Sequence, residues 1–428
     1  MSWVSLLCFG ICLGIVLSCF RREADILSPG RVFGFVWSLA IGLADLKLSR
    51  VQQTWSLEGW ALLLIGISSF LVGTSIAFVL SLGKKLVPIS VMRRLLRQEE
   101  VVEQRLFWFI VVGVGLYTVS YLVIFLAKGW LPVFVVGTKL SRVDFYVFGF
   151  GVLINSTAFI VFLTVVYLLL VNERRAEKIF LTSITLIALG SYFLLLQRFQ
   201  IIMAAIVCFT LLYYATSYIK PRIVLFMFLG VTVLFYWIST LRFRYLELLS
   251  LYLYSTSGMR FSATYAFLTE PYMYLVMNLE NFVRAVNLLD HHTYGYFTFD
   301  FLVSATGLEK WLGQYFAINR MPYLNSGYNT YSAFWVFYRD FGAAGLALIP
   351  FVLGLSISLL YYRMRSNPTI KNVTAYGVMA FVMFISFFVF PISFLWFLYN
   401  MLALYWGLRW ALRPRKSYVQ SGPIAEQH

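Results

Sequence analysis

The sequence predicts an all-α, polytopic integral membrane protein with about eleven transmembrane helices and one large folded loop on the outer side. Three observations predict this fold class: 61% of the 428 residues are hydrophobic, only 12% are charged, and the mean hydropathy is +0.80. A soluble chain carries about a quarter charged residues. This chain has too few polar side chains to cover the surface of a globular protein in water. The composition therefore excludes a cytosolic enzyme, a secreted disulfide-built domain and a disordered scaffold.

Each expected helix is an apolar stretch close to the length of about 20 residues that crosses a bilayer. The first has no basic segment before it and no small-residue cleavage site, which favours a retained helix over a signal peptide. The expected spans are Trp3–Phe20, Val32–Leu46, Glu58–Leu82, Leu106–Ala127, Phe145–Val171, Ile179–Leu196, Ile201–Ile219, Ile223–Leu241, Phe341–Tyr362, Val373–Phe390 and Ile392–Leu408.

Basic residues are concentrated in alternate connections between these helices. Short loops rich in Lys and Arg stay cytoplasmic, so the N-terminus is predicted outside and the C-terminal tail in the cytoplasm. We attribute the net charge of +16 to this topology and to contact with anionic lipids, rather than to nucleic acid. The basic connections hold Arg21, Arg22 and Arg31; Lys84, Lys85, Arg93, Arg94, Arg97 and Arg105; Arg174, Arg175 and Lys178; Lys220 and Arg222; Arg363, Arg365 and Lys371; and Arg409, Arg413, Arg415 and Lys416.

The topology divides the chain into four parts: an N-terminal helix bundle (1–241), a large outer loop (242–340), C-terminal helices (341–408) and a basic tail (409–428). The loop is dense in Tyr, Phe and Trp, which predicts a folded cap rather than a disordered linker. Within the loop, Ser262–Asn281 and Phe282–Leu289 are expected to be short helices, and Gly295–Gly327 an irregular or re-entrant stretch.

The familiar signatures of nucleotide, hydrolase and metalloprotease sites are missing from the sequence. The four cysteines lie in apolar stretches, where a thiol packs as a small hydrophobe. The adjacent residues His291 and His292 are unsuited to holding one metal ion together. If the chain is an enzyme, its substrate must therefore already be activated.

Arginines on or near the outer face are the first candidate functional residues. Topology does not select for positive charge on this face, and a guanidinium group binds phosphate oxygens through two parallel hydrogen bonds. The alternative is that each arginine pairs with a loop carboxylate or extends to lipid headgroups. The set comprises Arg142, Arg198, Arg242, Arg244, Arg260, Arg284, Arg320 and Arg339.

Carboxylates of the outer face form a second set. Glu270 and Asp340 border apolar stretches, where burial raises the pKa of a carboxyl group, so either is a candidate base for an acceptor hydroxyl. His291 or His292 is an alternative, since histidine titrates near neutral pH. Most of the set is expected to pair with the arginines: Asp144, Glu247, Glu270, Glu280, Asp290, Asp300, Glu309 and Asp340.

Polar residues also gather just before the ninth expected helix. Asp340 is placed to cap that helix, and Gly342 and Gly345 allow close helix packing. Capping and packing leave Asn329 and Tyr331 unexplained, and both side chains suit hydrogen bonds to a sugar. Aromatic residues there suit stacking on pyranose faces, with core packing as the alternative: Tyr323, Tyr328, Tyr331 and Trp335.

Four regions of the chain resemble the oligosaccharide repeat-unit polymerases of bacteria, the O-antigen polymerase (Wzy-type) family. Gly129–Phe134 with Arg142 is similar to the family's Gly-x-Pro-hydrophobic-Phe stretch and its downstream arginine. Arg198 stands where the family has an arginine after a helix, with Gln197 and Phe199 in place of the usual small residues.

The other two regions flank the large loop. Arg242 and Arg244 are placed like the family's arginine at the start of that loop. The block from Tyr328 to Gly345 is similar to the family's Asn-x-Tyr-Thr…Tyr-x-Asp-Phe-Gly-x-x-Gly block, with Ser332 where threonine is usual. The hydropathy profile matches along nearly the whole chain, whereas the motifs cover a small part of it.

The resemblance implies a GT-C-like glycosyltransferase of the bacterial inner membrane that moves a growing glycan from undecaprenyl pyrophosphate to a new lipid-linked repeat unit. It implies no cofactor or metal, because arginines supply the positive charge that stabilises the departing diphosphate. The implied partners are the lipid-linked oligosaccharide and the bilayer, with a chain-length regulator and a flippase as candidates and no nucleic acid. The implied site residues are Arg142, Arg198, Arg242 and Arg244 for the diphosphate; Asp340, Glu270 or His291 as the base; and Asn329, Tyr331 and Tyr328 for the sugar.

Three other hypotheses stay open. A purely structural membrane protein is disfavoured, because it would not need so many arginines on the outer face. An O-antigen ligase shares the general plan and the donor, but carries a histidine in the block before the final helices, where this chain reads Gly327-Tyr328-Asn329. A flippase or transporter is expected to show internal repeats with paired broken helices, and one dominant outer loop disfavours it.

Overall fold

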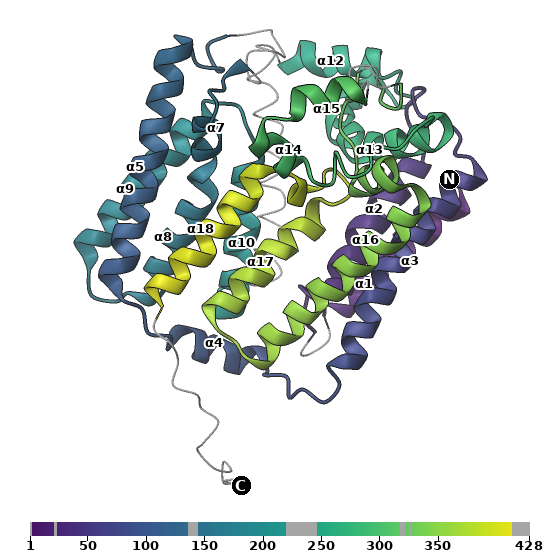
Figure 1. Ribbon diagram of the computed structural model, residues 1–428. Helices are drawn as coiled ribbons and strands as arrows, with labels where there is room; N and C mark the ends of the chain where they lie inside the picture. The colour runs from purple at the N-terminus through teal and green to yellow at the C-terminus, as the bar shows by residue number, and fades with distance from the viewer. Residues whose placement is uncertain are drawn as a thin grey trace.

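The computed structural model of the protein describes residues 2–20, 24–135, 144–219, 246–316, 322–325 and 327–412, and its regular elements in these ranges are helices (Figure 1). Long apolar helices form a bundle, and shorter ones cover its two ends. The bundle comprises α1 (Trp3–Ser18), α2 (Pro29–Asp45), α3 (Leu57–Leu80), α5 (Glu103–Lys128), α7 (Phe150–Leu153), η1 (Ile154–Ser156), α8 (Thr157–Leu170), α9 (Arg175–Phe193), α10 (Phe199–Ala215), α16 (Ala333–Ser366), α17 (Ile370–Ile385), η3 (Pro391–Ser393) and α18 (Leu395–Ala411). The end helices are α4 (Ile89–Arg97), α12 (Leu246–Thr256), η2 (Ala263–Leu268), α13 (Thr269–Leu288), α14 (Asp300–Thr306) and α15 (Glu309–Tyr315).

Each expected span overlaps a helix, or the consecutive elements α7, η1 and α8 in the case of Phe145–Val171, except 223–241, which lies outside the described residues. In the described part of the chain, 5 helices are long and apolar enough to cross a membrane: α3, α5, the continuous segment Phe150–Leu170, α9 and α16. Three shorter apolar helices, α1, α10 and α17, accompany them. The fold is therefore compatible with an α-helical membrane protein, and the number of eleven spans stays a prediction.

The outward faces of the long helices are apolar. On α3, Leu64 and Val72 are exposed, and on α5 Val112, Val119 and Leu126 are exposed. An apolar surface that extends over several helical turns is unfavourable in water, whereas it is favourable in contact with the hydrocarbon of a bilayer. These exposed faces are what a helix requires when one side packs on the bundle and the other faces lipid.

The bundle is held together by a close crossing of α3 and α16. A Cβ atom added to Gly73 would lie 2.3 Å from the backbone oxygen of Phe351, and one added to Gly354 would lie 2.2 Å from that of Phe70. The two backbones therefore approach at a distance that only glycine permits on either helix. On the other side of the bundle, α10 packs against α8 and α17, and α5 against α8 and α9.

Several of the described helices cover one end of the bundle, and one short helix covers the other (Figure 1). The helices α12, α13, α14 and α15 gather at one end, which we call the loop end. The helix α4 lies across the other end, where Val87 N donates to Arg365 O and Val102 N to Ala411 O, both at 2.8 Å. Arg174 pairs with Glu103 at 2.8 Å close by, so several basic connections meet at this α4 end.

The loop differs in three details from the expectation. The prediction of two helices, Ser262–Asn281 and Phe282–Leu289, is wrong. Instead, the 3-10 helix η2 is followed by α13, which runs without a break from Thr269 to Leu288. The stretch Gly295–Gly327, expected to be irregular, contains α14 and α15. Finally, α16 begins at Ala333, capped by Ser332 Oγ, and not near Asp340.

Candidate functional site

The candidate site is built on α13, which is docked against the bundle by polar side chains. The buried carboxylate of Glu280 forms an ion pair with Lys47 Nζ at 2.5 Å and accepts hydrogen bonds from Gln52 Nε2 at 3.2 Å and Trp55 Nε1 at 3.0 Å. These partners belong to the connection between α2 and α3. Burial lowers the pKa of Lys47, and the charge of Glu280 opposes that change. Glu280 is therefore a structural anchor.

Asn281 fixes the segment that leads into α16. Its side-chain nitrogen donates to the backbone oxygens of Tyr328 at 2.7 Å and Thr330 at 2.6 Å, and its side-chain oxygen accepts from Asn325 N at 2.9 Å. The side chain is completely buried. Asn281 thus holds the backbone of the predicted sugar-binding segment along α13. Sequence reasoning missed this residue, because an asparagine within a polar run of a helix carries no signal of its distant partners.

Two of the predicted site residues meet near the start of α13. Arg198 directly precedes α10 at the loop end, and its guanidinium group lies 3.7 Å from the carboxylate of Glu270 in the first turn of α13. Both side chains are nearly dehydrated, with 8% and 11% exposure. The guanidinium carbon also lies 5.5 Å from the ring centre of Tyr274, one helical turn after Glu270. Arg198 and Glu270 therefore form a buried ion pair, and the ring of Tyr274 lies beside the guanidinium group.

Tyr328 belongs to the same neighbourhood. Its hydroxyl group shares a hydrogen bond with the hydroxyl group of Ser257, just after α12. Burial raises the pKa of Tyr328; the hydrogen bond with Ser257 opposes that rise, and the nearby Tyr274 and Glu270 add to it. We call Arg198, Glu270, Tyr274 and Tyr328 the arginine–glutamate cluster.

Asp340 lies at the other end of α13 and organises the loop that follows that helix. Its carboxylate accepts hydrogen bonds from the Thr293 hydroxyl, from Phe297 N at 3.3 Å, and from both the backbone nitrogen and the hydroxyl of Thr298 at 2.6 Å. The side chain is completely buried. Four donors occupy the lone pairs that a general base would use, so the geometry favours a structural role. The expected helix cap is wrong: Asp340 lies inside α16, two residues before a kink at Gly342 with a φ of +62°.

Arg339 and His291 form a second polar group beside Asp340. The buried Arg339 donates from Nη1 to the backbone oxygen of His291, and its Nη2 lies 3.4 Å from Nε2 of the same histidine. The guanidinium carbon of Arg339 lies 4.7 Å from the ring centre of Tyr323. Asp290 Oδ1 lies 2.6 Å from His291 Nδ1. A hydrogen bond from Tyr323 holds the pKa of Asp290 below its usual range. Both ring nitrogens of His291 therefore have protein partners, because Nε2 also lies 3.3 Å from the backbone oxygen of Phe316.

The remaining sugar-binding candidates lie between these groups. Tyr331 stacks on Trp335 with ring centres 4.5 Å apart, so its ring face is used in packing. Asn329 is exposed. Asp300, at the start of α14, is a carboxylate that the site prediction did not single out. Burial, with the charge of Glu309, raises its pKa to about 6.

The predicted residues therefore fall into two groups. Glu270 and His291 are separated by nearly the whole of α13, roughly 27 Å at 1.5 Å per residue. Arg198, Glu270 and Tyr328 lie together at one end, and His291 and Asp340 at the other. Arg142, Arg242 and Arg244 lie outside the described residues. Among the residues that are described, no group of three or more His, Cys, Asp or Glu side chains is arranged to hold a metal ion.

Comparison of the chain with protein-family models, with curated proteins and with solved structures finds no match.

Proposed function

We propose that the protein is a membrane glycosyltransferase that polymerises undecaprenyl-pyrophosphate-linked repeat units into O-antigen or a related surface polysaccharide at the periplasmic face. The observation that carries the proposal is the buried Arg198–Glu270 pair at the loop end of the bundle. A buried ionisable pair is costly, which makes it a candidate for a functional rather than a packing role.

The roles follow from the charges. Arg198 binds the diphosphate of the donor, whose negative charge grows as the bond to the anomeric carbon breaks. The acceptor hydroxyl oxygen forms the new bond to that carbon, the electron pair of the broken bond stays on the diphosphate, and a base removes the hydroxyl proton. Tyr274 and Tyr328 line the same cluster and suit contact with the sugar.

Glu270 is the base that the geometry supports best. It is the carboxylate next to Arg198, whereas Asp340 accepts four hydrogen bonds and His291 lies at the far end of α13. A carboxylate paired with arginine is a weak proton acceptor. When the diphosphate binds Arg198, it competes for that cation, and Glu270 becomes a stronger acceptor. Donor binding would in this way activate the base.

The test uses the purified full chain in bilayers with a lipid-linked repeat unit, and scores ladder formation without added nucleotide or metal. Arg198→Gln and Glu270→Gln are expected to reduce ladder formation at least about 100-fold. The matched control is Arg260→Gln, which removes one charge from an exposed arginine between α12 and η2 and should leave the ladder unchanged. Arg198→Lys, which keeps the charge without the planar fork, should give a partial loss. A full ladder from folded Arg198→Gln protein would contradict the proposal.

A further inference from the structure

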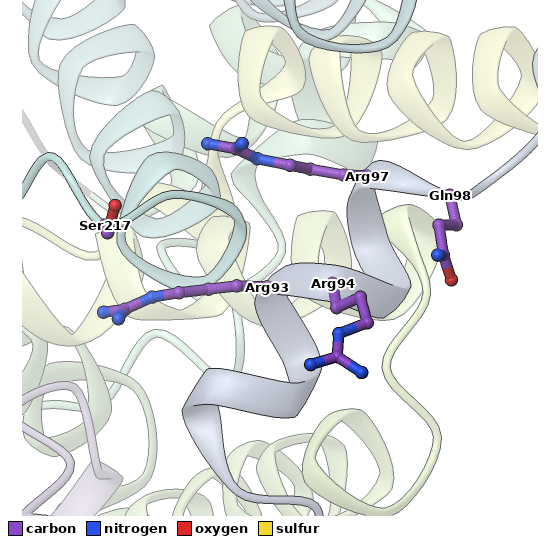
Figure 2. Close-up of a pocket in the computed structure, with 5 residues that line it drawn as sticks. All are labelled: Arg93, Arg94, Arg97, Gln98 and Ser217. Carbon is purple, nitrogen blue, oxygen red and sulfur yellow. The ribbon is translucent and has the colours of Figure 1, made fainter.

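A basic pocket lies at the α4 end of the bundle, opposite the arginine–glutamate cluster. It has a volume of about 360 Å³ and is lined by Arg93, Arg94, Arg97, Gln98 and Ser217 (Figure 2). Its arginines come from α4, and Ser217 from the segment after α10. Nothing in the proposed reaction uses these residues.

The helix α4 is held in a fixed position. Met92 and Leu96, four residues apart, are completely buried and attach one face of α4 to the bundle. The chain is joined to the end of α16 before α4, through Val87, and to the end of α18 after it, through Val102. Because both flanks and the apolar face are anchored, the arginines of α4 extend from a rigid support.

Arg93 and Arg97 act as a pair. They are four residues apart and therefore neighbours on the helix surface, and Figure 2 shows both side chains extending in the same direction, to the side of the pocket where Ser217 lies. Arg97 Nε donates to the backbone oxygen of Ala215 at 3.1 Å, which fixes its direction.

In the part of the chain that the structure describes, no salt bridge involves Arg93, Arg94 or Arg97. The Nε atom of Arg93 is buried without a hydrogen-bond partner among the same residues. Like charges four residues apart destabilise a helix, and a buried donor without an acceptor costs further free energy. A bound anion would remove both costs.

We propose that this pocket binds the phosphate group of an anionic phospholipid from the leaflet on the α4 side of the membrane. Guanidinium groups grip phosphate oxygens through paired hydrogen bonds, and basic pockets between spanning helices take anionic headgroups. The pocket lies where the apolar helices end, which is the level of the headgroups. Soluble phosphate has the same chemistry, but a lipid brings its phosphate to this level at high local concentration.

The experiment uses the full chain in nanodiscs of phosphatidylcholine with a small fraction of phosphatidylglycerol, followed by native mass spectrometry of retained lipid. The wild-type protein should retain phosphatidylglycerol at least about tenfold over its share of the bilayer. Arg93→Gln with Arg97→Gln should lower that enrichment about tenfold. Lys84→Gln with Lys85→Gln removes the same charge from two exposed lysines at the same end and should leave the enrichment unchanged.

Three outcomes would overturn the proposal. Equal losses in the two double variants would show diffuse attraction to the whole basic face. Full retention in the double variant Arg93→Lys with Arg97→Lys would exclude paired hydrogen bonds as the basis of binding. The third outcome is measured in detergent, to which either inorganic phosphate or phosphatidylglycerol is added. If phosphate raises the thermal midpoint of unfolding and phosphatidylglycerol does not, the ligand is soluble phosphate. Circular dichroism and size-exclusion profiles identify any variant that does not fold, and Arg93→Gln alone then serves in place of the double variant.

Discussion

Replacing both members of the Arg198–Glu270 pair with methionine should harm the fold much less than replacing either one. At 3.7 Å and an effective dielectric constant of about 20, the attraction between the two charges is roughly 4 kcal/mol. Removing Arg198 alone leaves a carboxylate of 11% exposure without that attraction, which costs about 3 kcal/mol. Removing both charges also removes the need to dehydrate them, so the double variant should lie within about 1 kcal/mol of the wild type.

The measurement is thermal unfolding of the four proteins in the same detergent. For a chain of 428 residues, a loss of about 3 kcal/mol lowers the midpoint by roughly 3 °C. The single variants Arg198→Met and Glu270→Met should show that drop, and the double variant should recover most of it. A double variant whose loss equals the sum of the two single losses would refute the coupling.

The same series separates stability from activity. In the proposed function, the double variant is stable and makes no glycan ladder, because it has neither the cation for the diphosphate nor the base. A purely structural pair predicts the opposite result, in which stability and ladder formation recover together. The double variant is therefore more informative than either single one.

Two further predictions concern packing and pH. Gly354→Ala should lower the free energy of unfolding by at least about 3 kcal/mol or prevent folding, because its Cβ would lie 2.2 Å from the backbone oxygen of Phe70. Gly190→Ala is the control, because its Cβ would meet nothing within 4 Å. This variant should be neutral or stabilising by up to about 1 kcal/mol. Thermal unfolding of the two variants checks this contrast. Because the pKa of Asp300 is raised to about 6, the folded state binds more protons than the unfolded one between about pH 4 and 6, and stability falls as pH rises through that window. Asp300→Asn should be more stable than the wild type by about 2 kcal/mol at pH 7.5 and equal to it near pH 4; a difference independent of pH would show that burial does not act on the carboxylate.

The long apolar helices could be predicted because a bilayer would set both their length and their composition. Residues such as Leu64 and Val112 carry that signal directly, since each faces outward on a long apolar helix. Helix ends were less predictable. Ser332 caps α16 and Asp340 does not, because α16 already includes the buried apolar stretch 333–337 before the chain reaches Arg339 and Asp340.

The site could be predicted only in part, because its contacts join distant segments. Arg198 and Glu270 were each expected to be functional, and nothing in either local sequence shows that they meet. Asp340 was expected to cap a helix or act as a base. Its real partners, Thr293 and Thr298, are ordinary loop threonines that acquire a role only when the loop folds back on α16.

The length of α13 limits which residues can share one reaction. A diphosphate bound by Arg198 cannot also contact His291, because roughly 27 Å of helix separates Glu270 from that end. In the proposed function, a glycan of several sugars that extends from the diphosphate along α13 would approach Asp290 and His291. In the proposed function the far end of α13 would then guide the polymer. We therefore expect His291→Ala to leave the first transfer intact and to change the length distribution of the products. Loss of that first transfer in folded His291→Ala protein would instead place proton transfer at the far end of the helix.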